Sequence, residues 1–319
     1  MKLLSRYAAP PFVYHEAYSC PWPEKHRFPM PKFRALKDVL VNGGIFKGDF
    51  AKPPHPLEVA QGLDAIYLTH ERQYVDRFLS NTLSKEETRR IGLDFNEHLV
   101  YRTLAEVGGT IHASDLALKY GLAINGAGGT HHAHFTYGSG FTIINDLAVT
   151  AKRLVHLGLA KSVLIFDLDV HQGDGTASLC ASDANIHTVS IHCENNFPFV
   201  KAKSDIDVGL EIGTSDEVYL SIIQSTLQDC FEKFKPDFVL YDAGVDISEF
   251  DLLGKLKVSE MGIYARDYTV LEACVKRGIA VCGVIGGGYD SNLPRLAARH
   301  SLLHRAAIGV WTEEKMEKS

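Results

Sequence analysis

Two side chains of the kind that bind metal ions stand two residues apart in the segment Asp169-Val170-His171. In an extended segment residues i and i+2 point the same way, so this carboxylate and this imidazole face one side. A catalytic zinc ion uses three protein ligands and keeps one position open for water. The third ligand must come from elsewhere, and Asp251 is the best candidate in the sequence. The simpler alternative is that these acids only cap helices or hold turns.

Two adjacent histidines, His131 and His132, follow a Gly-Gly-Thr turn. The carboxylates of Asp167 and Asp174 flank the two ligand-type residues, and each can orient one imidazole and raise its basicity. Two such pairs beside an activated water supply what amide hydrolysis needs, since one histidine takes a proton from the water and one gives a proton to the leaving amine. A histidine on its own is more often a structural hydrogen-bonding residue.

A tyrosine, Tyr289, follows three glycines. Glycine lets the backbone bend tightly and approach a ligand closely. The phenol could donate a hydrogen bond to a carbonyl oxygen as it becomes an oxyanion. A Gly-rich turn with a surface aromatic side chain is the alternative for this motif by itself.

Short apolar runs without polar alternation predict strands that are buried on both faces, as in a parallel sheet. Between these runs lie helical patterns, and Gly121, Gly158 and Gly278 stand just after three of them as stop signals. Strands that alternate with helices predict an α/β fold with one central, mostly parallel sheet flanked by helices. The predicted strands are Leu122–Asn125, Ser162–Asp169, His187–His192, Phe238–Asp242 and Ile279–Ile285, and the predicted helices are Glu97–Tyr120, Thr142–Leu157, Asp216–Phe234 and Ser259–Arg277, with a shorter one near Phe33–Leu40.

Polar clusters follow four of the predicted strands: GAGGTHHAH, DLDVHQGDG, DAGVDISEFD and GGGYD. In open α/β sheets ligands bind beyond the carboxyl ends of the strands. Four clusters at the same edge of the sheet therefore predict one site.

The composition of the whole chain is that of a globular protein. The 319 residues are 45% hydrophobic and 23% charged, and the formal net charge is −6. We expect one domain over residues 1–319, because no repeat or low-complexity linker divides the chain and the charged tail TEEKMEKS reads as frayed. The acidic balance argues against a direct nucleic-acid footprint and favours cationic substrates such as lysine side chains or polyamines.

The six cysteines form no CxxC pair, and they read as reduced, mostly buried thiols. The N-terminal apolar stretch is too short for a signal peptide, and no run of about 18 apolar residues predicts a membrane span. We expect a cytoplasmic protein, or a nuclear one if the source is eukaryotic.

In this order, the clusters resemble the histone deacetylase family, whose members share an arginase/deacetylase-like fold. The resemblance runs from about residue 67 to residue 289. It rests on GGTHHA at 128–133, GFTIIND at 140–146, DLDVHQGDGT at 167–176, DAGVD followed by Asp251, and GGGY at 286–289. The GGTHHA form, with HRFPMPKFRAL and HCENNFPF, is more similar to the class IV branch and its bacterial relatives.

The resemblance implies a zinc-dependent hydrolysis of N-acetyl-lysine, or of a longer N-acyl-lysine, in a protein or peptide. It implies that Asp169, His171 and Asp251 bind zinc, with iron(II) as an alternative metal. It further implies that His132 is the main general base and acid with Asp174 as its partner.

The same resemblance implies supporting roles for other residues. His131 would assist with Asp167 as its partner, and Tyr289 would polarise the scissile carbonyl. The substrate-binding positions that it implies are Gly140 and Phe141 in the acyl-lysine channel, Arg34 at the inner cavity and Asp94 at the rim. A potassium ion would bind at the positions of Asp167, Asp169, His171, Ser190 and Ile191.

Three other functions share some of these residues. A two-metal hydrolase like arginase would need more bridging carboxylates near the first metal. A small-molecule amidohydrolase, such as an acetylpolyamine deacetylase, would differ only at the pocket rim. A catalytically silent acyl-lysine binder would lack Tyr289, a histidine or a ligand, and all of these are present.

Overall fold

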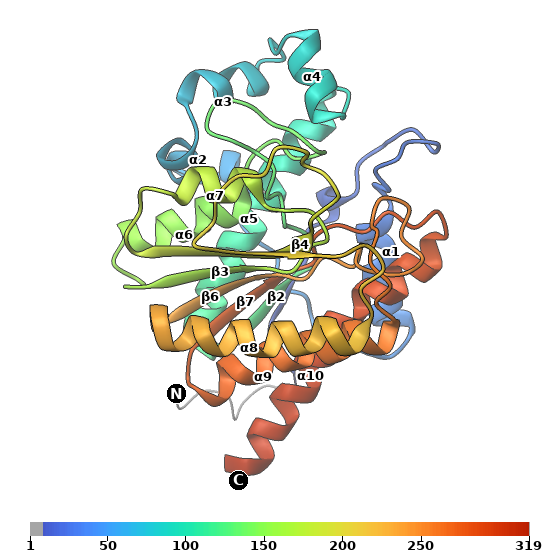
Figure 1. Cartoon of the computed structure of the whole chain (residues 1–319). Coiled ribbons are helices and arrows are strands. Elements are labelled where there is room, and N and C mark those ends of the chain that lie inside the picture. Colours follow the sequence, from blue (N-terminus) through green and yellow to red (C-terminus); the bar gives the residue numbers. More distant parts are fainter. Residues whose placement is uncertain (1–8, 319) are drawn as a thin grey trace.

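Seven strands form one sheet through the middle of the computed structural model, which describes residues 9–318 (Figure 1). Every strand pairing in this sheet is parallel, in the order β1-β2-β7-β6-β3-β4-β5. The predicted α/β fold with a central parallel sheet is confirmed. The strands are β1 (Phe12–Val13), β2 (Leu122–Asn125), β3 (Val163–Asp167), β4 (Ile186–Cys193), β5 (Ile206–Leu210), β6 (Phe238–Asp242) and β7 (Ala280–Val284).

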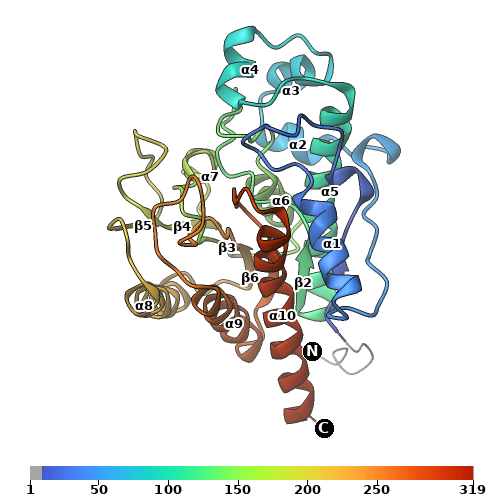
Figure 2. The same ribbon diagram turned by 90° about the vertical axis from the view of Figure 1, so that its right-hand side faces the viewer.

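Helices cover both faces of the sheet, with α8, α9 and α10 on one side and α5, α6 and α7 on the other (Figures 1 and 2). Helices α2, α3 and α4 lie beyond the second layer, and α1 packs against α10. The helices are α1 (Lys32–Asn42), α2 (Asp64–Thr69), α3 (Arg72–Leu79), α4 (Lys85–Ile91), α5 (Glu97–Tyr120), α6 (Asp146–His156), α7 (Asp174–Cys180), α8 (Asp216–Phe234), α9 (Glu260–Lys276) and α10 (Leu293–Lys318).

Strand β3 shows why the central strands read as continuous apolar runs. Val163 and Ile165 pack into one core cluster, whereas Leu164 and Phe166 pack into the other. All four side chains are fully buried because successive residues of a strand point to opposite faces and both faces carry helices.

Several boundaries differ from the predicted ones for local reasons. Helix α6 begins at Asp146 rather than Thr142, because Asn145 caps it and Phe141 holds a left-handed backbone conformation (φ +65°) that no helix accepts. The tail that reads as frayed continues α10 from Thr312 to Lys318 instead, and its last residue, Ser319, lies outside the described residues. Edge strands β1 and β5 were not predicted, since one has two residues and the other alternates between buried and exposed positions.

The strand order brings the predicted polar clusters together. Strands β2, β7, β6 and β3 are consecutive neighbours in the sheet, and each is followed by one of the four clusters. Since all strands run in parallel, the four loops leave the same edge of the sheet. Within residues 9–318, no helix combines the length and the apolar character of a membrane span.

Candidate functional site

Three side chains with metal-ligand atoms converge after strands β3 and β6. Nitrogen and oxygen atoms of Asp169, His171 and Asp246 all lie within 4.8 Å of one another, and all three residues are buried. His171 Nδ1 lies 3.0 Å from Asp169 Oδ1 and 3.1 Å from Asp246 Oδ2. The side chains of Asp169 and His171 do meet, but residues 169–171 form a bend and not the predicted extended segment, because the Asp169 carboxylate also accepts the backbone N–H of His171.

The third predicted ligand, Asp251, lies next to this group but is not one of its three members. Its Oδ1 accepts the backbone N–H groups of Leu253 and Gly254, and its Oδ2 accepts the N–H of Tyr289 at 2.7 Å. Burial raises the pKa of the Asp251 carboxyl, and the nearby His171 opposes this shift. The two bonds to Oδ1 use both of its lone pairs, but Oδ2 keeps a second lone pair, so Asp251 can still bind a metal through Oδ2.

The donor set fits a divalent cation. Oδ2 of Asp246 is buried without a hydrogen-bond partner among the described residues, and it faces the imidazole of His171. Burial and the carboxylate of Asp169 raise the pKa of Asp246 to about 7. Burial opposes the charged form of His171, but the same two carboxylates raise its pKa to about 9. A proton or a metal ion must therefore balance this cluster, and one imidazole with two carboxylates is a ligand set that zinc or iron(II) accepts.

The second histidine of the pair has a carboxylate partner in helix α7. Nδ1 of His132 lies 2.7 Å from Oδ1 of Asp174, while Nε2 of His134 lies 3.1 Å from Oδ2. Burial, together with the neighbouring His131, lowers the pKa of His132 to about 4. His132 is therefore a neutral imidazole at pH 7, and it can accept a proton.

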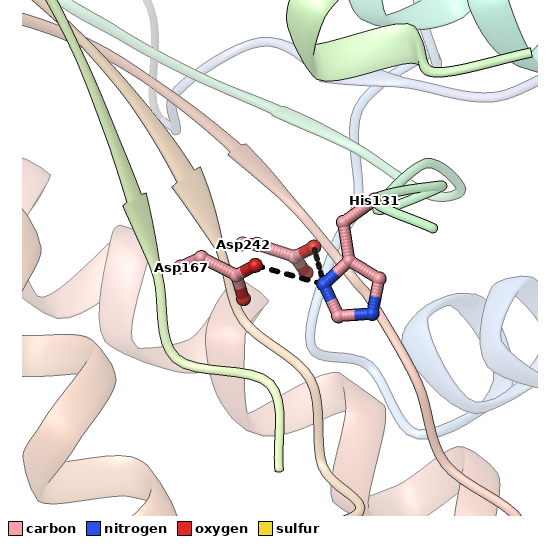
Figure 3. A group of neighbouring side chains, drawn as sticks. All are labelled: His131, Asp167 and Asp242. Atoms are coloured by element: carbon pink, nitrogen blue, oxygen red, sulfur yellow. Dashed lines mark hydrogen bonds and ion pairs between the residues drawn. The ribbon is translucent and has the colours of Figure 1, made fainter. Parts of the chain in front are cut away.

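The first histidine of the pair is held by carboxylates from two adjacent strands (Figure 3). Nδ1 of His131 lies 2.8 Å from Oδ2 of Asp167, at the end of β3, and 3.9 Å from Oδ2 of Asp242, at the end of β6. Its Nε2 lies 3.8 Å from Oδ1 of Asp169. Burial disfavours the charged form, but the carboxylates, with Asp167 foremost, raise the pKa of His131 well above its usual value.

The two histidines thus differ in protonation although they are adjacent in sequence. Burial acts to lower the pKa of both histidines. The pKa of His131 is nevertheless raised, because more carboxylate charge surrounds it. Opposite shifts of two neighbouring groups are how a site obtains an acid and a base at one pH.

The turn that carries the histidines is fixed by a buried aspartate, Asp146, at the start of α6. Its Oδ1 accepts the backbone N–H groups of Gly129 and Thr130, at 3.1 and 2.8 Å. Gly129 has φ +87°, and a Cβ there would lie 2.6 Å from the Cα of Gly286. The final Asp of the GFTIIND segment therefore positions the His pair, and only glycine allows this approach of two loops.

Tyr289 stands beside the metal-type cluster, where its ring centroid lies 6.2 Å from that of His171. Burial and the carboxylates of Asp169 and Asp246 raise the pKa of the phenol well above 10. The hydroxyl therefore stays protonated and can donate a hydrogen bond.

Aromatic rings line the approach to this cluster. Phe141 lies 5.9 Å from Tyr289, and Phe197 meets His132 edge-on at 4.9 Å, both measured between ring centroids. Gly140 lies between them, and a Cβ on it would come within 2.6 Å of His132. The predicted channel residues Gly140 and Phe141 thus border the same cavity as His132, His171 and Tyr289.

Two predicted substrate-binding residues lie away from this cavity. Arg34 is exposed, and its side chain contacts Tyr14 instead. A buried cation does face the interior, but it is Lys32, whose Nζ donates to the carbonyl of Gly286 at 3.0 Å. Asp94 is exposed and follows Gly92, which lines the cavity, by two residues.

The mouth of the cavity is basic, although the chain as a whole is acidic. The cavity has a volume of about 510 Å³, and Arg27, Arg89 and Arg90 line it without any Asp or Glu of the described chain. The expectation of a negative surface for cationic substrates therefore fails at this entrance, because net charge does not report how charges are distributed.

Three of the five positions implied for potassium lie on neighbouring strands, and the other two, Asp169 and His171, lie in the loop after β3. Asp167 and Ser190 are partners in the register of β3 and β4, and Ile191 follows on β4. The hydroxyl of Ser190 contacts Nδ1 of His192 at 3.0 Å. A potassium site at these positions stays a prediction.

Sequence reasoning missed five residues of the site. Asp246 is the last residue of the DAGVD motif and could have been considered as a ligand beside Asp251. His134 is the third histidine of the HHAH motif and could have been considered together with His131 and His132. Nothing in the spacing pointed to Lys32 or Phe197, which reach the site through long-range packing. The five are Lys32, His134, Phe197, Asp242 and Asp246.

Comparisons with known proteins agree on one family. The sequence pattern of the histone deacetylase domain matches residues 26–303. An uncharacterized protein of Picosynechococcus sp. is 48% identical over 301 residues, which are 94% of this chain and 99% of the relative. Histone deacetylase 2 of Arabidopsis thaliana is 29% identical (86% of this chain, 72% of the relative), and the acetoin utilization protein AcuC of Staphylococcus aureus is 29% identical (84% and 73%). The crystal structure of the HDA15 HD domain has the same fold, with a TM-score of 0.78 at 19% identity, over 98% of this chain and 93% of that one.

Proposed function

The chain belongs to the histone deacetylase family, and from that premise we propose that it hydrolyses N-acyl-lysine side chains of proteins or peptides, in a zinc-dependent reaction, to free lysine and a carboxylate. One observation carries the proposal. Two His–Asp pairs, at 2.8 and 2.7 Å, flank a buried cluster of metal-ligand atoms at the end of an aromatic-lined cavity. This combination supplies a proton acceptor, a proton donor and a place for a Lewis acid.

The metal ion would be held by Asp169, His171 and a third carboxylate from the loop after β6. Asp251 is our proposed third ligand, and Asp246 is its rival because its oxygen lies closer to His171. When bound, a zinc ion there would act as a Lewis acid toward the scissile carbonyl and the attacking water.

The side chains of the site divide the proton transfers. His132, neutral at pH 7 and oriented by Asp174, accepts a proton from the attacking water. His131, which the surrounding carboxylates keep protonated, holds positive charge beside the reacting atoms and can assist protonation of the leaving amine. The phenol of Tyr289 donates a hydrogen bond to the carbonyl oxygen as negative charge develops on it.

The shape of the cavity supports a long, thin substrate. Phe141 and Phe197 border the approach to His132, and apolar walls suit the methylene stem of an acylated lysine. Acylation removes the lysine charge, so the substrate side chain can enter an apolar channel without the cost of burying an ammonium group.

The alternatives are weaker on specific grounds. A polyamine substrate would bring several positive charges to a mouth lined by three arginines and no carboxylate of the described chain. A second metal at His131, Asp167 and Asp242 would have to displace the 2.8 Å contact of the His131–Asp167 pair. We therefore propose one catalytic metal per chain. We also propose that a separate potassium ion binds at the β3–β4 positions and that the protein is related to the class IV branch.

The proposal is tested with peptides that release a fluorophore after removal of an acyl group from lysine. Wild-type protein loaded with zinc is compared with chelator-treated protein and with His132→Ala, using acetyl and longer acyl chains. We expect turnover that needs both the metal and His132. Absence of turnover for every acyl chain, in protein shown to contain one zinc ion, would refute the proposed activity.

A further inference from the structure

Three arginines form a basic rim around the entrance of the cavity. Arg27 comes from the segment before α1, while Arg89 and Arg90 come from the last turn of α4. All three are exposed, and none has an ion-pair partner within residues 9–318. Arg90 packs over the ring of Tyr137 at 4.7 Å, which leaves its N–H groups free to bind a ligand. We call these residues the arginine collar.

The collar is fixed to the wall of the channel by contacts of Phe141. The backbone N–H of Phe141 donates to the carbonyl of Ile91 at 2.7 Å, which ties the end of α4 to the channel. On the other segment, the ring of His26 lies 6.0 Å from that of Phe141. The residues next to Arg27 and Arg90 in sequence, His26 and Ile91, thus both contact Phe141, which is why two distant segments bring their guanidinium groups to one entrance.

Exposed apolar side chains also line the cavity. Phe199 is 88% exposed and Leu252 is 65% exposed. A ligand that covers this entrance therefore meets both arginines and apolar side chains. Exposed apolar side chains grouped at a pocket mark a contact surface for a larger partner.

We propose that the arginine collar selects acyl-lysine peptides that carry acidic residues next to the acylated lysine. The inference rests on the proposed deacylase activity, and it names the substrate class of that site. Guanidinium groups pair with carboxylates through two parallel hydrogen bonds, and the excess of positive charge steers anionic ligands to the entrance. The net charge of −6 over the whole chain would repel the same peptides, so the preference has to come from the collar.

The collar is placed to contact the peptide and not the acyl group. The acyl group would enter the far end of the channel, where the Nζ of the buried Lys32 is already bound to the carbonyl of Gly286. A carboxylate on the acyl chain would therefore not reach Arg89 or Arg90. Residues flanking the acylated lysine, by contrast, remain at the entrance.

The test compares three peptides of equal length with glutamate, glutamine or lysine on both sides of one acetyl-lysine. Zinc-loaded wild-type protein is compared with the double variant Arg89→Gln/Arg90→Gln, and Arg305→Gln, at an exposed position of α10, serves as the matched control. Both kcat/KM and the Kd from fluorescence anisotropy are measured at low and high salt.

We expect wild-type protein and Arg305→Gln to prefer the glutamate peptide over the glutamine peptide by about tenfold at low salt, with the preference shrinking as salt screens the charges. The double variant should lose this preference, so that its kcat/KM values for the glutamate and glutamine peptides become similar. Charge reversal, Arg89→Glu/Arg90→Glu, should favour the lysine peptide.

Equal kcat/KM and Kd for the three peptides, or a preference that survives in the double variant, would overturn the collar as a selector. Preference for free acetyl-lysine or for succinyl-lysine over the glutamate peptide would do the same. A lack of turnover with all peptides would instead count against the deacylase activity, and the anisotropy measurement would still report on the collar.

Discussion

The carboxylate of Asp251 accepts a hydrogen bond of 2.7 Å from the backbone N–H of Tyr289. One oxygen thus joins a proposed metal ligand, in the loop after β6, to the residue proposed to bind the substrate carbonyl, in the loop after β7. Since β6 and β7 are neighbouring strands, the two loops leave the sheet side by side. The position of the phenol and that of the metal are therefore coupled through the backbone.

Substitution of the two rival carboxylates should separate their roles. We expect Asp251→Asn to reduce zinc content strongly, because an amide is a poor ligand for zinc compared with a carboxylate. Asp246→Asn should keep most of the zinc if Asp246 only supports the cluster through its bond from Val170 N–H. Metal analysis after gel filtration measures both. Zinc loss in Asp246→Asn alone would assign the third ligand to Asp246.

Substitution of the proton acceptor His132 should slow catalysis strongly and leave metal binding intact. We expect His132→Gln to lower kcat by about 10²- to 10⁴-fold, the range for a general base. Asp174→Asn should lower kcat less, since it releases both His132 and His134 but leaves the imidazoles in place. Steady-state kinetics with zinc content as the control test this order, and a larger loss in Asp174→Asn would contradict it.

The phenol of Tyr289 should act mainly in the transition state. Tyr289→Phe removes one hydroxyl and keeps the ring that packs against Phe141 and His171. We expect kcat to fall by about 10²- to 10³-fold with little change in KM, as for loss of one oxyanion donor. Unfolding temperature serves as the control, because an equal loss of stability would point to a structural role.

Amide substitution of the two buried aspartates beside His131 should reduce activity to very different extents. Burial raises the pKa of Asp242 well above its usual value, and neither of its oxygens has a hydrogen-bond partner among the described residues. Burial thus favours the protonated form of Asp242, whereas Asp167 bonds to His131. We expect Asp242→Asn to keep activity within about threefold, while Asp167→Asn loses tenfold or more.

The raised pKa of Asp242 also predicts that the stability of the fold depends on pH. An acid with a raised folded pKa binds its proton more tightly in the folded state, so its contribution falls as pH rises above its unfolded pKa near 4. Metal-free Asp242→Asn should therefore be more stable than the wild type at pH 8, and the difference should shrink toward pH 4. Urea unfolding at several pH values with chelator present measures this, and equal curves would show that Asp242 is ionised.

Acid should destabilise the fold through a buried histidine outside the site. Burial lowers the pKa of His304 to about 4, while the unfolded state binds a proton below about 6.5. The stability that His304 contributes is present above pH 6.5 and is lost as pH falls to 4, by up to about 3 kcal/mol. His304→Leu, which keeps the packing against Phe12, should unfold with a weaker pH dependence in this range. Parallel curves for the two proteins would contradict the assignment.

The central part of the fold could be predicted because its strands are buried on both faces. The segments of β3 and β6 are continuous apolar runs, which is the pattern of strands with a helix layer on each face of the sheet. The edges could not be predicted, since β1 has only two residues and the exposed face of β5 is polar. The last turns of α10 are charged, so their helical structure could not be predicted from an apolar pattern. The first part of α10 anchors the helix, because Leu296 and Leu303 pack into the core.

The site could be predicted as far as local spacing determines geometry. The histidines lie on a turn next to the carboxyl end of a strand, where the rule for α/β sheets puts a site. The spacing of two residues brings Asp169 and His171 together, although in a bend and not in an extended segment. The position of Lys32 could not be predicted, because its contact with Gly286 spans 254 residues and depends on how α1 packs. Arg34 differs from it by only two positions on the same helix, and so the resemblance pointed to the wrong side of α1.

The position of β7 between β2 and β6 has a consequence for how the protein is made. During synthesis the ribosome releases β2 and, much later, β3 to β6, but these two portions of the sheet share no hydrogen bonds until residues 280–284 emerge to join them. The loop with Tyr289 follows directly. A nascent chain that stops short of β7 therefore holds two unpaired strand edges and lacks Tyr289, so we expect such products to aggregate and to be inactive.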